Sequence, residues 1–235
     1  VSMSSEKQAA PRNLSVAMIA RNEAAVLAET IESVRDIADD LFVLDTGSTD
    51  DTVRIAEKAG ARVATLPWTD DFSVARNCAM DQIESDWILW LDAGETLSSD
   101  STSALRAFVD SEAARIRLVP NHPELRYRGR IREDLNKSLE QLDLSVDMAP
   151  GRIHRHRREN LPNRKAEKAR RNLRIVSAEY QGAEDLPVRL LLAAAEAFSD
   201  LQEVEKARQA FLQATQQAER GSTDHLDAYY GLLTT

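Results

Sequence analysis

Cysteine is almost absent from this chain, since Cys78 is the only one among 235 residues. A single thiol forms no intrachain disulfide, so the composition favours a protein of a reducing compartment such as the cytoplasm. No charged segment followed by an apolar stretch and a cleavage site opens the sequence, and we expect no secretion signal. The longest apolar runs, 15–20 and 87–91, fall far short of the ~20 residues that cross a membrane, so we expect no transmembrane helix.

Basic residues are in the minority, with 30 against 39 acidic ones and a net charge of -9, which argues against general nucleic-acid binding. They are also unevenly spread, because residues 126–174 hold 15 of the 30 basic side chains and only 7 of the acidic ones. Aromatic side chains that could stack on bases are nearly absent from that segment. The segment therefore indicates a local anion site, and we expect a phosphate on a small molecule as its ligand.

Short apolar runs alternate with amphipathic stretches up to about residue 119, which is the pattern of βα units. The sequence predicts a doubly wound α/β domain with a mostly parallel sheet. Ser48 or Thr49 is expected to cap a helix with its hydroxyl, and Gly60 to end that helix. The expected strands are 14–20, 41–44, 61–66, 87–91 and 114–119, and the expected helices are 23–35, 50–59, 71–83 and 99–109.

The pattern changes after residue 120. Arginines alternate with other residues at Arg126, Arg128, Arg130 and Arg132, which predicts a strand with one solvated or ligand-facing side.

The C-terminal part is predicted to be helical from residue 163 onward, as a small all-α region. Part of it resembles the tetratricopeptide (TPR) consensus, and such a region could bind a protein partner. One unit cannot bury both faces alone, so it either packs on the α/β domain or begins an array of which this chain is a fragment. The abrupt end inside 227–233 favours the fragment. The predicted domains are a flexible N-terminus (1–12), the α/β domain (13–160) and the helical region (161–235). The TPR-like positions are Leu191, Ala194, Ala195, Phe198, Ala207, Phe211 and Ala214.

Four polar segments lie at predicted strand ends, where open α/β sheets bind ligands. Asp45 directly follows a buried strand and suits a ribose hydroxyl or a base N–H, although residues 45–50 taken alone are also a helix N-cap. Asp92 follows a buried strand, where an unpaired carboxylate would be costly without a metal or a donor. No G-x-G-x-x-G turn follows the first strand, which disfavours a Rossmann dehydrogenase. The segments are ARNE (20–23), DTGSTD (45–50), WTDDFSVARN (68–77) and DWILWLDAGE (86–95).

In this order and spacing, MIARNEA, LDTGSTDDT, WTDDFSVARN and WILWLDAGE resemble the family 2 glycosyltransferases of the GT-A fold, especially the bacterial branch with TPR-like helices. The resemblance runs from about residue 14 to residue 97, and more weakly to residue 174. It implies an inverting enzyme that moves a sugar from a nucleoside-diphosphate sugar, most simply a UDP-sugar. The acceptor that it implies is a glycan, a lipid or a protein.

The resemblance also implies the residues that bind the donor. Asp45 would accept a hydrogen bond from the base N3–H, and Arg76 would approach the diphosphate or the acid cluster. A plainer interpretation of Arg76 is an ion pair with a neighbouring acid. The nucleotide-sugar site expected in this way comprises Ala20, Arg21, Asn22, Glu23, Asp45, Ser48, Phe72, Arg76, Asn77 and Asp92.

A divalent metal, Mn²⁺ or Mg²⁺, is implied by the position of Asp92 at the family's Asp-x-Asp motif. The second acid of that motif is replaced by Gly94. Glu95 could reach the ion instead, or Asp92, the diphosphate and water could hold it alone. His154 resembles a histidine that closes over the diphosphate or metal in some relatives, and a surface histidine is the alternative.

The catalytic base is expected on Asp134 or Glu133, which resemble a later acidic pair of the family. TPR-bearing relatives usually place His where this chain has Arg132. The alternative for the pair is an ordinary helix N-terminus, because two acids there suit the helix dipole. For the whole chain, the alternative function is a catalytically degenerate nucleotide-sugar binder or a TPR-type interaction module.

Overall fold

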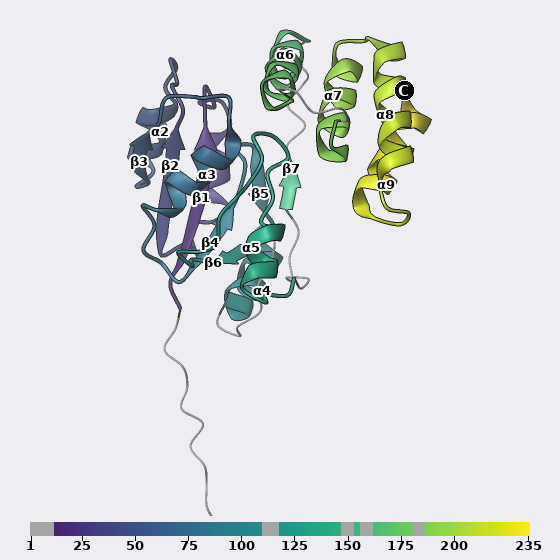
Figure 1. Ribbon diagram of the computed structural model, residues 1–235. Coiled ribbons are helices and arrows are strands. Elements are labelled where there is room, and N and C mark those ends of the chain that lie inside the picture. Colours follow the sequence, from purple (N-terminus) through teal and green to yellow (C-terminus); the bar gives the residue numbers. More distant parts are fainter. Residues whose placement is uncertain (1–11, 110–117, 147–152, 156–161, 181–185) are drawn as a thin grey trace, which may run out of the picture. The chain divides into compact units, whose positions relative to one another are not determined.

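The chain forms two compact units in the computed structural model, which describes residues 12–109, 118–146, 153–155, 162–180 and 186–235 (Figure 1). Unit 1 takes its residues from 1–68, 75–126 and 135–156, and unit 2 from 69–74, 127–134 and 157–235. Two short internal segments therefore belong with the C-terminal helices. The predicted domain boundary at residues 160 and 161, and all but the last residue of the N-terminal segment expected to be flexible, lie outside the described residues.

Unit 1 is built on a five-stranded mixed sheet. Its strands are β1 (Leu14–Ala20), β2 (Asp40–Asp45), β3 (Arg62–Thr65), β4 (Trp87–Trp90) and β6 (Leu118–Pro120). They lie in the order β3-β2-β1-β4-β6, and only β6 pairs antiparallel to its neighbour. The central strand β1 is almost wholly buried, which explains its nearly unbroken apolar sequence. The predicted α/β class with a mostly parallel sheet is confirmed.

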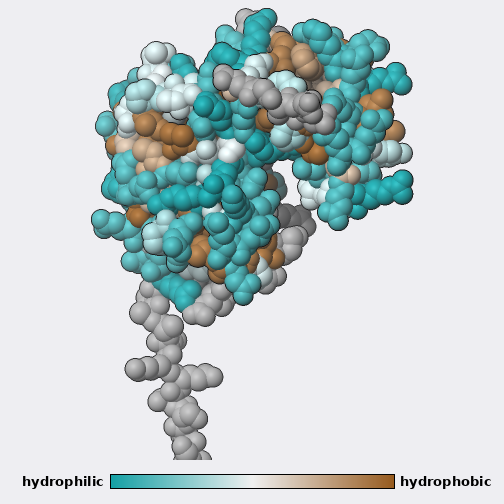
Figure 2. Space-filling view, in the orientation of Figure 1, coloured by the Kyte–Doolittle hydropathy of each residue, from teal (hydrophilic) through white to brown (hydrophobic). Residues whose placement is uncertain are grey.

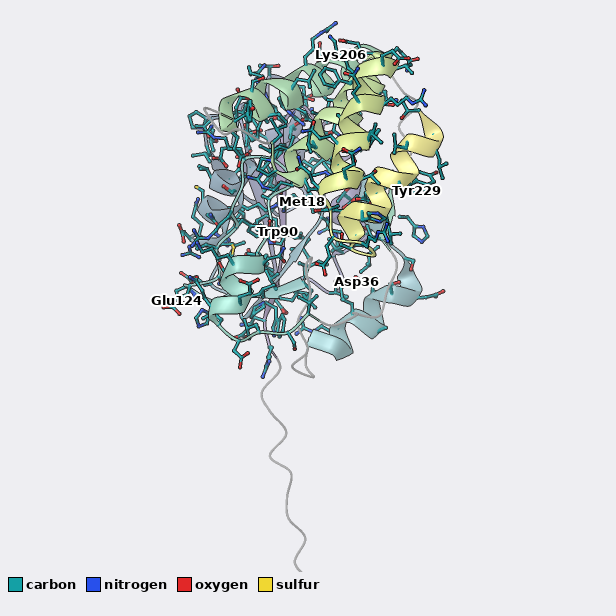
Figure 3. The ribbon with its side chains drawn as sticks, turned by 45° about the vertical axis from the view of Figure 1, so that its right-hand side comes forward. Met18, Asp36, Trp90, Glu124, Lys206 and Tyr229 are labelled. Carbon is teal, nitrogen blue, oxygen red and sulfur yellow. The ribbon has the colours of Figure 1, made fainter. Side chains whose placement is uncertain are left out.

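The core of unit 1 joins the sheet to α1 (Leu27–Glu32). Leu27 and Ile31 lie four residues apart on one face of α1, and both belong to the hydrophobic cluster that contains Met18 of β1 (labelled in Figure 3). This helix is shorter than the predicted 23–35, and the N–H groups of Glu23 and Ala24 before it donate to side chains of Thr52 and Asp50. The other helices of this part of the chain are α2 (Thr52–Lys58), α3 (Phe72–Met80) and α4 (Ser99–Val109).

The start of α2 differs from the expectation. Its N-cap is Asp51, whose side chain makes no capping hydrogen bond, and the predicted cap by Ser48 or Thr49 is wrong. The Asp50 carboxylate instead accepts from the Thr52 N–H at 3.0 Å. The hydroxyl of Ser48 is used elsewhere, because it accepts from the backbone of residue 22. Gly60 follows the helix with a φ of 87°, as the sequence indicates.

A second, two-stranded sheet in unit 1 is formed by β5 (Glu95–Leu97) and β7 (Ile153–Arg155), which pair antiparallel. Neither strand is predicted from the sequence, because three residues carry too little periodicity to identify a strand. The expected strand 114–119 is described only from residue 118 onward, where it forms β6.

The arginine-rich stretch is a loop and not the predicted strand. Residues 127–134 form no strand, and the β-type pairing within them is a single antiparallel bridge between Arg128 and Asp134. Gly129 and Arg132 have positive φ values of 91° and 49°, which no regular strand accommodates. The chain therefore turns back on itself here, and α5 (Asn136–Gln141) follows.

Unit 2 contains four helices of the described chain, α6 (Pro162–Glu179), α7 (Val188–Asp200), α8 (Val204–Gln217) and α9 (Thr223–Thr234). Leu191 and Ala195 of α7 are buried in one cluster with Phe211 of α8, as the TPR-like spacing predicts. Gly231 of α9 allows a close approach of these helices, because a Cβ there would lie 2.3 Å from the Phe211 ring. The predicted C-terminal helical region is confirmed.

Hydrophilic side chains cover most of the face shown in Figure 2. In the described segments we find no helix that combines the length and the apolar character needed to cross a membrane. Large exposed apolar side chains occur on α9, where Tyr229 is 54% exposed and is labelled in Figure 3.

Candidate functional site

The carboxyl ends of β1 and β2 bring the first two polar segments together. Ala20 lies opposite Asp45 in the parallel register. Thr46 fastens the two ends, because its N–H and its hydroxyl both donate to the Ala20 carbonyl, at 2.9 and 3.2 Å. Carboxyl ends of parallel strands are where α/β sheets bind ligands, so this edge is the first candidate for a site.

Asp45 places a buried carboxylate at this edge, with 3% of the residue exposed. One carboxylate oxygen accepts from the N–H groups of Gly47 and Ser48, at 3.0 and 3.1 Å. Gly47 has a φ of 100°, and this left-handed turn brings both amides back over the end of the strand. A carboxylate has about four acceptor positions, so two backbone amides fix its orientation and leave capacity for a further donor.

Asn22 ties the turn after β1 to the turn after β2. Its backbone has a φ of 56°, its N–H donates to the Ser48 hydroxyl at 2.9 Å, and its side-chain oxygen accepts from the Thr49 N–H at 2.7 Å. The predicted binding residues Asn22 and Ser48 therefore hold the two turns against each other. Arg21, beside them, is exposed.

Thr52 also fastens these turns, and sequence reasoning missed it. Its hydroxyl accepts from the Glu23 N–H at 2.7 Å and donates to the Asp50 carboxylate. The Asp50 carboxylate in turn accepts from the Ala24 N–H at 3.2 Å. The sequence signal is that Thr52 directly follows the polar run 45–50, which taken alone is also a helix N-cap.

Arg76 and Phe72 come from one helix but belong to different units. The guanidinium of Arg76 lies over the ring of Trp90, 4.7 Å from its centre, in unit 1. This contact with a buried aromatic ring holds the guanidinium by a cation–π interaction. Phe72 belongs to unit 2, where the Arg171 guanidinium lies 5.1 Å from its ring centre. Asn77, the other predicted residue of this helix, is half-buried in unit 1.

The end of β4 is arranged differently from the end of β2. Asp92 is exposed, whereas Glu95 is buried and its carboxylate accepts from the Asp92 N–H at 3.0 Å. Gly94, between them, has a φ of 91° and donates its N–H to the Thr30 hydroxyl at 2.8 Å. The carboxylate of Glu95 thus supports the turn, and one predicted acid, Asp92, is left facing solvent.

His154 of β7 does not lie directly opposite Glu95 of β5 in the small two-stranded sheet. It is exposed and pairs with Thr96, the neighbour of Glu95 on β5. Successive side chains of a strand point to opposite faces, so Glu95 and His154 lie on opposite faces of this sheet. Over the described ranges, no group of three or more His, Cys, Asp or Glu could hold a metal ion. Asp92, Glu95 and His154 therefore do not fit the predicted metal site as a set.

Glu133 and Asp134 lie at the end of the loop 127–134, and both are half-buried. The backbone of Asp134 is fixed by two hydrogen bonds with Arg128, at 2.9 and 3.1 Å. The helix that follows begins at Asn136 with no acidic residue in its first turn. The pair lies directly before the N-cap of this helix, Leu135, so a role at the helix start and a role as catalytic base both stay open.

Comparison with known proteins agrees with the sequence motifs. The model of glycosyl transferase family 2 matches residues 15–179, which is more than half of the chain. The chain therefore belongs to glycosyl transferase family 2.

Several relatives share part of this region. A TPR repeat-containing protein of Synechococcus elongatus is 38% identical over 150 residues, which are 56% of this chain and 37% of that protein. A glycosyltransferase of Rickettsia felis is 44% identical over 87 residues, which are 37% of this chain and 30% of that protein. This chain thus spans well under half the length of these curated relatives.

Among solved structures, a similar one is glucosyl-3-phosphoglycerate synthase from Mycobacterium tuberculosis in complex with Mn²⁺, UDP and glucosyl-3-phosphoglycerate. The two are 27% identical with a TM-score of 0.38, over 45% of this chain and 42% of that chain.

Proposed function

We propose that this chain binds a nucleoside-diphosphate sugar at the carboxyl ends of β1 and β2, as the donor-binding part of an inverting glycosyltransferase. The observation that carries the proposal is the Asp45 carboxylate, which is buried at a strand end and oriented by the amides of Gly47 and Ser48. Membership of glycosyl transferase family 2 supports the same function.

UDP is the proposed nucleotide. A uracil ring has an N3–H donor, and an ionised carboxylate is a strong acceptor for it. Arg21 is exposed beside the same strand end and is proposed to lie next to the nucleotide base, and Arg76 is the proposed cation for the negatively charged diphosphate. The resemblance in the motifs at residues 20–23 and 45–50 favours this assignment over GDP or CDP.

The proposed chemistry is the attack of an acceptor hydroxyl on the anomeric carbon of the donor, with the nucleoside diphosphate as the leaving group. Asp134 is the proposed general base, and Glu133 is its alternative. A carboxylate can take the hydroxyl proton as the new glycosidic bond forms. A divalent ion, when bound, would offset charge on the leaving diphosphate, and Asp92, whose side chain is exposed, is proposed to contact it.

A thermal-shift screen with UDP, GDP and CDP, each with and without Mn²⁺, tests the proposal. A ligand that binds the native state raises the melting temperature, and we expect the largest rise with UDP. If GDP or CDP raises the melting temperature as much as UDP does, the assignment of uracil as the preferred nucleobase is wrong. No rise with any nucleotide at millimolar concentration would contradict donor binding.

A second candidate is a nucleotide-sugar binder without transfer activity. Gly94 in place of an acid and the inward-facing carboxylate of Glu95 favour it, because both reduce the acidic groups available at the end of β4. Such a protein would bind UDP and UDP-sugars but release no UDP from them in the presence of acceptors. Measuring UDP release from UDP-sugars separates it from the enzyme.

A further inference from the structure

The loop 127–134 is attached to the C-terminal helices by its own backbone. The carboxylate of Glu179, the last residue of α6, accepts from the Arg130 N–H at 3.2 Å. Arg189 of α7 donates to the Ile131 carbonyl at 3.2 Å. Glu179 and Arg189 also form an ion pair with each other. Glu179 and Arg189 together therefore bind a backbone N–H and a backbone carbonyl of the loop. These groups belong to the residues three and two positions before Glu133.

Gly129 leaves room for this arrangement. A Cβ at that position would lie 3.1 Å from a terminal nitrogen of Arg189, and the backbone φ of 91° disfavours a side chain there as well. The loop and the Arg189 guanidinium are thus in close contact over residues 129–131.

Arg132 makes a second attachment, directly before the acidic pair. Its guanidinium lies 2.5 Å from Glu196 on α7, and 3.5 Å from Asp227 and 3.9 Å from Asp224 on α9. Arg132 has a φ of 49°, a left-handed conformation that is unfavourable for a residue with a side chain. Three carboxylates thus surround the guanidinium of Arg132 at this bend.

We propose that Glu179 and Arg189 are positioning residues for Glu133 and Asp134, so that α6 and α7 belong to the catalytic machinery rather than to an appended interaction module. This inference rests on the proposed function, because the loop matters for transfer only if it carries the base. A general base must lie within hydrogen-bond reach of the proton it removes. Fixing the loop backbone from two helices is a means to hold a carboxylate there.

A matched control exists on the same two helices. Lys165 of α6 and Asp200 of α7 form an ion pair at 3.0 Å that makes no contact with the loop in the described structure. If Glu179 and Arg189 only joined α6 to α7, replacing either pair would have the same consequences.

The test is hydrogen exchange of the peptide 127–134, measured by mass spectrometry in the 235-residue chain carrying Glu179→Met, Arg189→Met or Asp200→Asn. We expect exchange of the loop amides to rise about tenfold in the first two variants, as the loss of a hydrogen bond predicts, and to stay unchanged in Asp200→Asn. Glu179→Gln keeps an acceptor oxygen for the Arg130 N–H but loses the ion pair, so its loop exchange should remain near the wild-type rate.

Equal loop exchange in Asp200→Asn and Glu179→Met, or unchanged exchange in all variants, would overturn the inference. If Glu179→Met fails to fold, Arg189→Met compared with Asp200→Asn gives the same test. Transfer assays with a UDP-sugar separate positioning from a purely structural role: Glu179→Met and Arg189→Met should lower kcat with the KM for the donor nearly unchanged, and Asp200→Asn should change neither. Wild-type kcat in both Met variants would overturn the inference. UDP titration of wild type separates this inference from the proposed function, because absent UDP binding contradicts the function, whereas the loop exchange still decides whether the pair holds the loop.

Discussion

The strand-end site of unit 1 and the loop 127–134 of unit 2 are both proposed to act in one reaction, but they are held in place in different ways. At the strand end, Asn22, Asp45 and Thr52 are fixed by hydrogen bonds to residues of the same two turns. The loop is fixed by Glu179 and Arg189, which follow it by about 50 residues and belong to helices. The geometry of the proposed donor site is therefore set by nearby residues, whereas the position of the proposed base depends on the tertiary structure of the C-terminal region.

The two regions also differ in charge. Neutral backbone amides orient Asp45, whereas ion pairs of Arg132 and Arg189 hold the loop. Ion pairs between partly exposed groups are screened by salt, and hydrogen bonds to backbone amides are much less so. The strand-end site should thus keep its geometry over a wider range of conditions than the loop.

The largest effect is expected on the rate of transfer, when the proposed base in the loop 127–134 is replaced. Asp134→Asn and Glu133→Gln should be compared with an acceptor that supports transfer, and the true base should lose about 10²–10⁴ in turnover. UDP affinity should stay nearly unchanged, because the proposed base acts on the acceptor hydroxyl and not on the nucleotide. If both variants transfer at the wild-type rate, the base lies elsewhere.

A smaller effect is expected on donor affinity. Asp45→Ala should weaken UDP binding by about 1.5–3 kcal/mol, the range of a hydrogen bond to a charged group, as measured by calorimetry. Asp40→Asn is the control, because Asp40 lies at the opposite end of the same strand and bonds to Arg62 and Ser15. Unchanged UDP affinity in Asp45→Ala would remove Asp45 from the site. Equal losses in both variants would indicate a general loss of stability.

The end of β4 offers a third comparison. Gly94→Asp should tighten Mn²⁺ binding in the presence of UDP, because it restores a second carboxylate next to Asp92. The φ of 91° at this position disfavours any side chain, and we expect a loss of about 1 kcal/mol of stability. Gly94→Asn carries the same backbone cost without the charge. Equal Mn²⁺ affinity in the two variants, by titration calorimetry, would contradict a metal role for Asp92.

The smallest effect concerns pH. Hydrogen bonds from Arg62 lower the pKa of Asp40, against partial burial, which raises it. A carboxyl whose folded-state pKa is depressed contributes stability above its unfolded pKa of about 3.9 and loses it as the pH falls through the folded value. Wild type should therefore be more stable than Asp40→Asn at pH 7, and the difference in melting temperature should shrink below about pH 4. A constant difference down to pH 2 would rule out this ion pair as its cause.

The sequence was sufficient to predict the sheet and the segments at its carboxyl edge. Apolar runs such as 14–20 are long enough to identify a buried strand, and the polar run 45–50 directly follows one. The role of Glu95 could not be predicted, because its hydrogen bond to the Asp92 N–H depends on a tight turn through Gly94. Alternating arginines suggested a strand, since periodicity does not register a backbone bend such as the one at Arg132.

The contacts of the loop 127–134 also cannot be predicted from the sequence. Glu179 and Arg189 lie in helices with no motif of their own, and they meet the loop only because unit 2 brings distant segments together. A sequence pattern predicts the local geometry of a segment, whereas contacts between distant residues can be identified only from the three-dimensional fold.

Hydrogen exchange of the wild-type chain with and without saturating UDP tests the central claim, donor binding at the strand ends, most directly. The account predicts that UDP slows exchange in peptides covering 20–24 and 45–52, where the amides of Gly47 and Ser48 orient the Asp45 carboxylate. Peptides of α7 and α8 should exchange at the same rate in both samples. Protection confined to those helices, or no change anywhere in the chain, would contradict the account.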